Sequence, residues 1–169
     1  MPEKQTLERA QEDAREGKSP STQAGEFVRE EIEHIREGKH GARSTKQAIA
    51  IGLSKARRAG VKLPPPKAGK VSARTRAQAQ RDSRKGKSSR RHKPSATRSQ
   101  ATSKALKREG RSAASRQSLS RQTRSAAQQR SSASRRQAAI KAVRTKGKTG
   151  VRQAALKAAR TRATHRKAA

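Results

Sequence analysis

The fold of this chain is decided by residues 21–63, which read STQAGEFVREEIEHIREGKHGARSTKQAIAIGLSKARRAGVKL. In the first half of this stretch, apolar residues recur at spacings of three and four, as they do on one face of a helix. These residues are Ala24, Phe27, Val28, Ile32 and Ile35. The pattern predicts a helix over residues 21–37 that ends at Gly38, because glycine readily adopts the left-handed conformation found after a helix.

A second helix is predicted over residues 44–59. Its start, from Ser44 to Gln47, fits a capping box, in which the serine and glutamine side chains each bond a free backbone N–H group of the first turn. Its apolar stripe consists of Ile49, Leu53 and Ala56. The two helices together predict a helical hairpin over residues 19–63. Its expected core consists of Phe27, Val28, Ile32, Ile35, Ile49, Leu53 and Leu63.

The hairpin is small for a unit that folds alone, since about 43 residues lie near the lower limit for independent folding. We therefore expect a third element to complete it. A short helix over residues 3–16, within an acidic segment at residues 1–18, is one candidate. Self-association through residues 21–63 and a bound ligand are the others. A triple-proline linker at residues 64–66 ends the hairpin, because consecutive prolines form a stiff extended spacer.

Residues 67–169 form a basic tail with 32 Lys or Arg residues and only two acids, Asp82 and Glu109. Its large aliphatic residues are Val71, Leu106, Leu119, Ile140, Val143, Val151 and Leu156. Seven such side chains do not offset the roughly 1–2 kcal/mol per residue lost when a backbone is ordered. The predicted fold class is therefore mostly α and disordered, with a small helical hairpin followed by a disordered, low-complexity tail. Parts of the tail are expected to become helical on binding.

Several function classes are excluded or disfavoured by composition. Cysteine is absent, which excludes disulfides and thiolate metal sites. The four histidines, His34, His40, His92 and His165, show no metal-ligand spacing, and no nucleophile–base or phosphate-loop motif occurs. We expect neither enzymatic activity nor a metal or cofactor. No apolar run approaches the ~20 residues that cross a bilayer, and the first residues lack a signal core, so a cytoplasmic location is expected.

The charge distribution predicts a polyanion as the partner. The formal net charge is +33, yet residues 1–38 hold ten acids and six bases. Neutralising ~30 phosphates would occupy on the order of 50 Å of duplex DNA. The residues expected to contact nucleic acid are Lys46, Lys55, Arg57, Arg58, Arg90, Arg91, Lys93, Arg135, Arg136, Lys141, Arg144, Lys146, Lys148, Arg152, Lys157, Arg160, Arg162, Arg166 and Lys167.

Several alternatives remain open. The tail has no Phe, Tyr or Trp on which bases could stack, so backbone-directed binding to duplex DNA is favoured and structured or ribosomal RNA comes second. The helix over residues 44–59 could enter a major groove as a helix-turn-helix reader, but the turn is long and the first helix acidic. The hairpin could instead bind a protein partner while the tail localises it, or the tail could be a solvated linker.

Two parts of the chain resemble known proteins. Residues 25–61, which read GEFVREEIEHIREGKHGARSTKQAIAIGLSKARRAGV, resemble the core of a family of small basic bacterial proteins without an assigned function. That resemblance covers residues 20–66 and implies a bacterial source. The Lys/Arg/Ala/Ser composition of the tail is similar to that of histone H1-like nucleoid proteins. The resulting hypothesis is a nucleoid-associated protein that binds DNA with little sequence preference.

Overall fold

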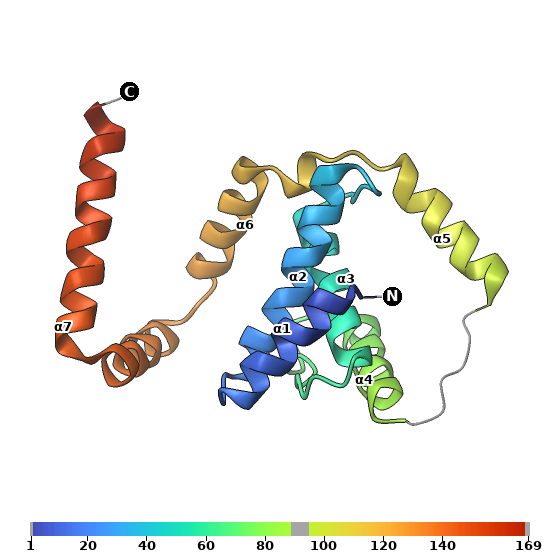
Figure 1. The fold of residues 1–169 in the computed structure, drawn as a ribbon, viewed down its shortest axis with the longest axis horizontal. Helices are drawn as coiled ribbons and strands as arrows, with labels where there is room; N and C mark the ends of the chain where they lie inside the picture. Colours follow the sequence, from blue (N-terminus) through green and yellow to red (C-terminus); the bar gives the residue numbers. More distant parts are fainter. Residues whose placement is uncertain (1, 89–94, 168–169) are drawn as a thin grey trace. The chain divides into compact units, whose positions relative to one another are not determined.

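The structure is a computed structural model that describes residues 2–88 and 95–167, and all regular elements in these ranges are helical. The chain divides into two units, Met1–Gln122 and Thr123–Ala169. The first unit contains α1 (Lys4–Arg15), α2 (Pro20–Glu37), α3 (Thr45–Arg58), α4 (Ala73–Lys87), α5 (Ala96–Arg108) and η1 (Ser112–Ala114) (Figure 1). Helix α6 (Arg116–Gln128) spans the boundary between the units, and α7 (Ser132–Lys167) belongs to the second.

The two helices of the predicted hairpin are confirmed as α2 and α3, which pack against each other. Helix α2 ends at Gly38, whose φ of 81° is left-handed. At the start of α3, the Ser44 hydroxyl accepts a hydrogen bond from Gln47 N at 3.2 Å. The Gln47 side chain accepts from Arg43 N at 2.8 Å, so the second bond of the capping box goes to the residue before the predicted partner.

The core of the first unit consists of two apolar clusters along α2. One contains Ile32, Ile35, Ala42, Ala48, Ala113 and Ala114. The other contains Ala10, Ala24, Phe27 and Ala56. Helix α1 therefore supplies a third element through Ala10, and α2 lies between α1 and α3. Gly52 allows α3 to approach α2 closely, since a Cβ atom there would lie 2.7 Å from the Val28 Cα atom.

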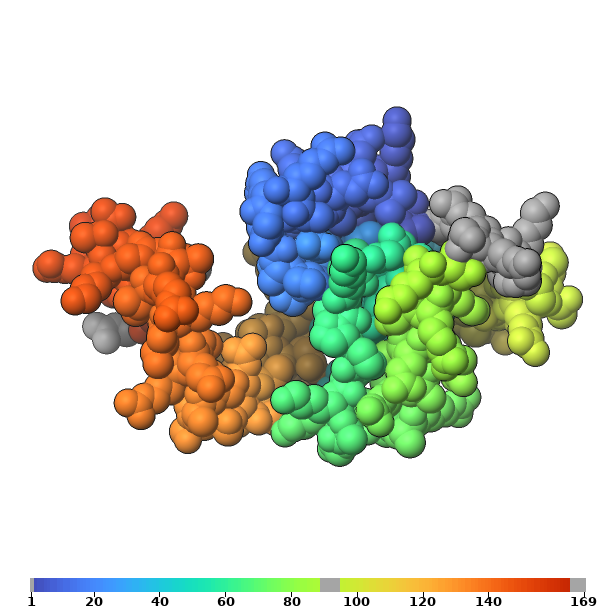
Figure 2. Space-filling model, turned by 90° about the horizontal axis from the view of Figure 1, so that it is seen from below, coloured from blue at the N-terminus to red at the C-terminus, as the bar shows by residue number. Residues whose placement is uncertain are grey.

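The first helix of the basic tail, α4, packs against α3, as Figure 2 shows for the lime-green and teal segments. Ala79 and Asp82 face α3 and are buried. Gly86 allows the closest approach, because a Cβ atom there would lie 2.0 Å from the Arg57 carbonyl oxygen. The folded unit thus extends well past the triple proline.

A second part of the tail covers the other end of the hairpin. Ala113 and Ala114 of η1 are buried against α2 and α3. The Thr45 hydroxyl donates to the Ala113 carbonyl at 2.7 Å, and Arg36 Nε donates to the Ala114 carbonyl at 3.0 Å. The turn between α2 and α3 joins this contact, since Gly41 N donates to the Leu106 carbonyl at 2.9 Å.

The second unit consists of α7 together with the end of α6. Helix α7 is broken at Gly147, which has φ 69° and ψ 168° and separates two helical segments. Most side chains of residues 132–164 are exposed. Ile140 and Leu156 remain 56% and 54% exposed, so these segments do not bury an apolar face within the chain.

The predicted fold class is therefore wrong, because residues 67–169 are not a disordered tail wherever the structure describes them. The prediction counted only large aliphatic residues, whereas the tail packs with alanines and is anchored by Asp82. It also gave too little weight to local helix signals. Ala, Gln, Lys and Arg all favour helix. The hydroxyls of Ser72, Ser115 and Ser131 accept hydrogen bonds from the first turns of α4, α6 and α7, as N-cap residues do.

Among the helices of the described ranges, none has the length and apolar character that crossing a membrane requires.

Candidate nucleic-acid interface

The four hairpin cations predicted to contact phosphate have different surroundings. Lys46 lies exposed in the first turn of α3. Arg57 is only 7% exposed, and its guanidinium donates to the Pro64 carbonyl at 3.3 Å. Arg58 donates to Asp82 at 2.8 Å. Arg57 and Arg58 therefore make contacts within the folded unit and are not part of the candidate interface.

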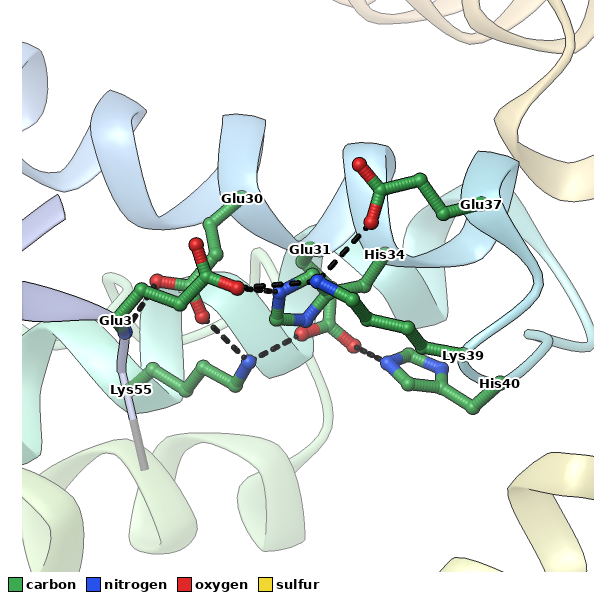
Figure 3. A network of polar contacts seen from close by, with 8 residues as sticks. All are labelled: Glu3, Glu30, Glu31, His34, Glu37, Lys39, His40 and Lys55. Atoms are coloured by element: carbon green, nitrogen blue, oxygen red, sulfur yellow. Dashed lines mark hydrogen bonds and ion pairs between the residues drawn. The ribbon is translucent and has the colours of Figure 1, made fainter. Parts of the chain in front are cut away.

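Lys55 is the fourth of these cations, and two glutamates of α2 hold it. Its Nζ atom lies 3.0 Å from a Glu30 oxygen and 2.8 Å from a Glu31 oxygen (Figure 3). Burial opposes the charge of Lys55, but the contacts with Glu31 and Glu30 outweigh it, so the pKa of Lys55 is raised above its ordinary value. The charge of Lys55 is thus compensated inside the unit.

Helix α4 carries a cationic solvent face that the sequence prediction did not single out. Arg74, Arg81 and Lys85 are exposed and follow each other at spacings of seven and four residues. At 3.6 residues per turn, this spacing places them on one side of a helix. The opposite side carries Ala79, Asp82 and Gly86, which face α3. Packing on α3 thus fixes which cations of α4 point outward.

A hollow lined by arginines lies where α2, η1 and α6 meet. Its lining residues are Arg36, Arg111, Ala114, Ser115 and Arg116, and its volume is about 410 Å³. The bond from Arg36 to the Ala114 carbonyl holds that guanidinium at the rim. Arg116 is the first residue of α6, so backbone N–H groups of a helix start lie nearby. Arginine forks and helix N-termini both favour phosphate oxygens.

The largest set of predicted contact residues lies on α7. Those whose side chains the structure describes are all exposed: Arg135, Arg136, Lys141, Arg144, Lys146, Lys148, Arg152, Lys157, Arg160 and Arg162. Arg166 and Lys167 belong to the last turn of the helix. Arg90, Arg91 and Lys93 lie outside the described residues. The Gly147 break divides the exposed cations into two groups of five.

Counter-charges are scarce along these surfaces. In the described part of the chain, no Lys or Arg after Asp82 forms an ion pair with a carboxylate. Residues 123–169 contain no acidic residue at all. Phe27 is the only Phe, Tyr or Trp of the chain and is fully buried. The exposed surfaces therefore offer charge for phosphates but no Phe, Tyr or Trp ring for stacking on bases.

Comparison with known proteins identifies one domain. Residues 15–68 match the model of a family of unknown function (DUF6496). The match contains α2 and α3 and ends before α4, so most of the cationic surface lies beyond it. No curated protein and no solved structure matches the chain.

Proposed function

We propose that this chain is a non-enzymatic protein that binds the phosphate backbone of nucleic acid, with duplex DNA as its principal partner. The observation that carries the proposal is the set of exposed cations without carboxylate partners on α4 and α7. Ten of them line the described part of α7. A surface of this charge attracts a polyanion strongly, because binding releases the counterions condensed on the phosphates.

The proposed interface has two parts, one on the first unit and one on α7. The α4 face and the hollow lined by Arg36, Arg111 and Arg116 belong to the first unit, in which α4 packs on α3 and η1 packs on α2 and α3. Helix α7 adds cations around the whole circumference of its two segments. We expect the first unit to position the protein on the backbone and α7 to supply most of the affinity.

Sequence-independent binding is the expected outcome of this chemistry. Contacts to phosphate fix position and orientation but do not read bases. The surface lacks the aromatic platforms of single-strand readers, which favours duplex over single-stranded partners. Location at the nucleoid and a role in DNA compaction, as for the histone H1-like proteins whose tails have a similar composition, follow from this proposal.

The test is a binding series with the full-length chain after removal of bound nucleic acid. Fluorescence anisotropy would measure its affinity for two duplex DNAs of unrelated sequence, a single-stranded DNA and a structured RNA, each over a range of salt concentrations. We expect equal affinities for the two duplexes, a weaker affinity for the single strand, and a steep linear fall of log K with log salt. An affinity that hardly changes with salt would refute the proposal. Tighter binding to the RNA at every salt concentration would make structured RNA the partner.

A further inference from the structure

Two histidines and a glutamate that are separate in sequence meet beneath the turn after α2. Glu31 and His34 lie one turn apart on α2, and His40 follows the left-handed Gly38. Their potential ligand atoms all lie within 4.8 Å of one another. The two imidazole rings stand edge to face, with centroids 6.1 Å apart. Glu31 is fully buried, and Figure 3 shows its carboxylate close to the two imidazole rings.

The contacts of His40 make one of its nitrogens an acceptor that faces Glu31. Its Nδ1 lies 3.0 Å from the Gly41 carbonyl oxygen, which can only accept, so Nδ1 carries a proton. In a neutral imidazole the other nitrogen then presents a lone pair. That nitrogen, Nε2, lies 3.3 Å from Glu31 Oε1. A lone pair and a carboxylate oxygen repel each other at this distance unless a positive charge lies with them.

For His34 the outer nitrogen, Nε2, is the one that makes a hydrogen bond. Its Nε2 lies 2.7 Å from Glu3 Oε1 and donates to that carboxylate, which leaves Nδ1 as the nitrogen with a lone pair. Figure 3 shows the His34 ring between Glu3 and Glu31. A carboxylate that accepts from the outer nitrogen of a histidine is the usual support of a metal-binding imidazole, because it fixes the tautomer and raises the basicity of the inner nitrogen.

Glu31 divides its two oxygens between different neighbours. Oε2 lies 2.8 Å from Lys55 Nζ, whereas Oε1 faces His40. Oε1 receives no hydrogen bond of ordinary geometry from the described residues. Buried polar atoms in this state are rare and call for an explanation. Lys55 thus engages one side of the carboxylate and leaves the other side available to a second cation.

The charge of the surrounding network also calls for a cation. The residues drawn in Figure 3 include four carboxylates, from Glu3, Glu30, Glu31 and Glu37, and two ammonium groups, from Lys39 and Lys55. The carboxylates thus outnumber the ammonium groups beside Glu31, although the chain as a whole has a formal charge of +33.

We propose that Glu31, His34 and His40 bind one divalent transition-metal ion of the zinc class. Imidazole nitrogens and a carboxylate oxygen are the ligands that this class takes in proteins. In a tetrahedral zinc site each ligand atom lies about 2.0–2.1 Å from the metal, so two ligand atoms lie about 3.3 Å from each other. His40 Nε2 and Glu31 Oε1 are separated by this distance, 3.3 Å. The ion would tie α2 to the turn that leads into α3 and would leave a fourth position for water.

The test measures metal binding directly on full-length protein freed of nucleic acid and treated with a chelator. Calorimetry with zinc chloride would give the affinity and stoichiometry, and cobalt(II) would report the ligand geometry by visible absorption. We expect one ion per chain. His34→Gln and His40→Gln should each weaken binding at least tenfold. The matched control is the double variant His92→Gln and His165→Gln, which removes the other two histidines of the chain and should bind like the wild type.

A further variant distinguishes loss of the metal site from loss of folding. Glu3 is exposed, so Glu3→Gln should keep the helical content by circular dichroism while weakening zinc binding about 10-fold or more, as loss of an outer carboxylate does. Absence of zinc binding by the folded wild type would overturn the proposal. Equal affinity of the wild type and both histidine variants would also overturn it.

Discussion

Arg58 Nε donates a hydrogen bond of 2.8 Å to Asp82 Oδ1 and so joins the second helix of the hairpin to the first helix of the basic region. The same carboxylate accepts from the Ser54 hydroxyl at 2.6 Å and from the Gln78 amide at 3.0 Å. Asp82 is only 1% exposed. One of the two acids after residue 66 thus attaches α4 to the folded unit.

The first prediction concerns this attachment. Asp82→Asn removes the charge that Arg58 faces and replaces one carboxylate oxygen by an NH2 group, so that one of the two donors of α3, Ser54 or Arg58, loses its acceptor. We expect the free energy of unfolding to fall by about 1–3 kcal/mol, the usual cost of an unsatisfied buried group. Urea denaturation followed by circular dichroism would measure it. The matched control is Glu109→Gln, which removes the other acid of the basic region, and equal effects of the two variants would contradict the role of Asp82.

The second prediction is a pH dependence. Burial works against the charge of Asp82, but the hydrogen bonds from Ser54 and Arg58 outweigh it and hold its pKa below the ordinary value. Its stabilising effect is therefore complete above the unfolded pKa of about 3.9 and is lost as the pH falls through the lower folded pKa.

Unfolding experiments from neutral to acid pH on the wild type and Asp82→Asn would test this dependence. The difference in stability between the two proteins should be constant near neutral pH and should shrink below about pH 4. A difference that stays constant down to the lowest pH would show that the charge of Asp82 does not stabilise the fold.

The third prediction compares two helical glycines. A methyl group at Gly52 would collide with the Val28 backbone, whereas nothing lies within 4 Å of one at Gly25. Gly52→Ala should therefore destabilise the protein by about 1–3 kcal/mol through overpacking. Gly25→Ala should stabilise α2 by up to about 1 kcal/mol, because alanine favours helix over glycine. Thermal unfolding measures both, and a neutral Gly52→Ala would contradict the close contact of α2 and α3.

The fourth prediction tests the arginine hollow. Arg116→Gln removes one guanidinium from its rim. We expect weaker binding to every duplex sequence and a salt slope reduced by about 1, as when one cation no longer reaches a phosphate. Lys4→Gln is the control, since Lys4 is exposed on α1 beside Glu8. If both variants bind DNA alike, the hollow does not contact phosphate.

The hairpin could be predicted because its signals are local. One stretch of sequence contains all of these signals: the apolar periodicity of α2 and α3, the glycine that ends α2 (Gly38) and the serine that caps α3 (Ser44). The attachment of α4 was also visible in part, since Ser72 precedes a run in which Ala79, Asp82 and Gly86 share one helical side. Large apolar residues, the usual signal of a core, are absent from this side of α4, which packs through alanine, glycine and a paired acid instead.

The cluster of Glu31, His34 and His40 could not be read from spacing. His40 reaches Glu31 only because Gly38 reverses the chain and because Gly41 bonds to the Leu106 carbonyl, far along the sequence. The partner of His34, Glu3, belongs to the start of α1. Contacts of this kind depend on how several helices pack, so no short sequence motif predicts them.

The most direct test of the account replaces Arg135, Lys141, Arg144, Arg152 and Lys157 together by glutamine in the full-length chain. These side chains are exposed, so folding of the first unit should be unchanged. The control exchanges Arg and Lys at the same five positions and keeps the charge. Binding to a duplex of about 20 base pairs over a salt series should show a slope smaller by about 0.9 for each phosphate that the variant no longer neutralises, and the control should keep the wild-type slope. An unchanged slope in the glutamine variant would contradict the claim that α7 binds the phosphate backbone.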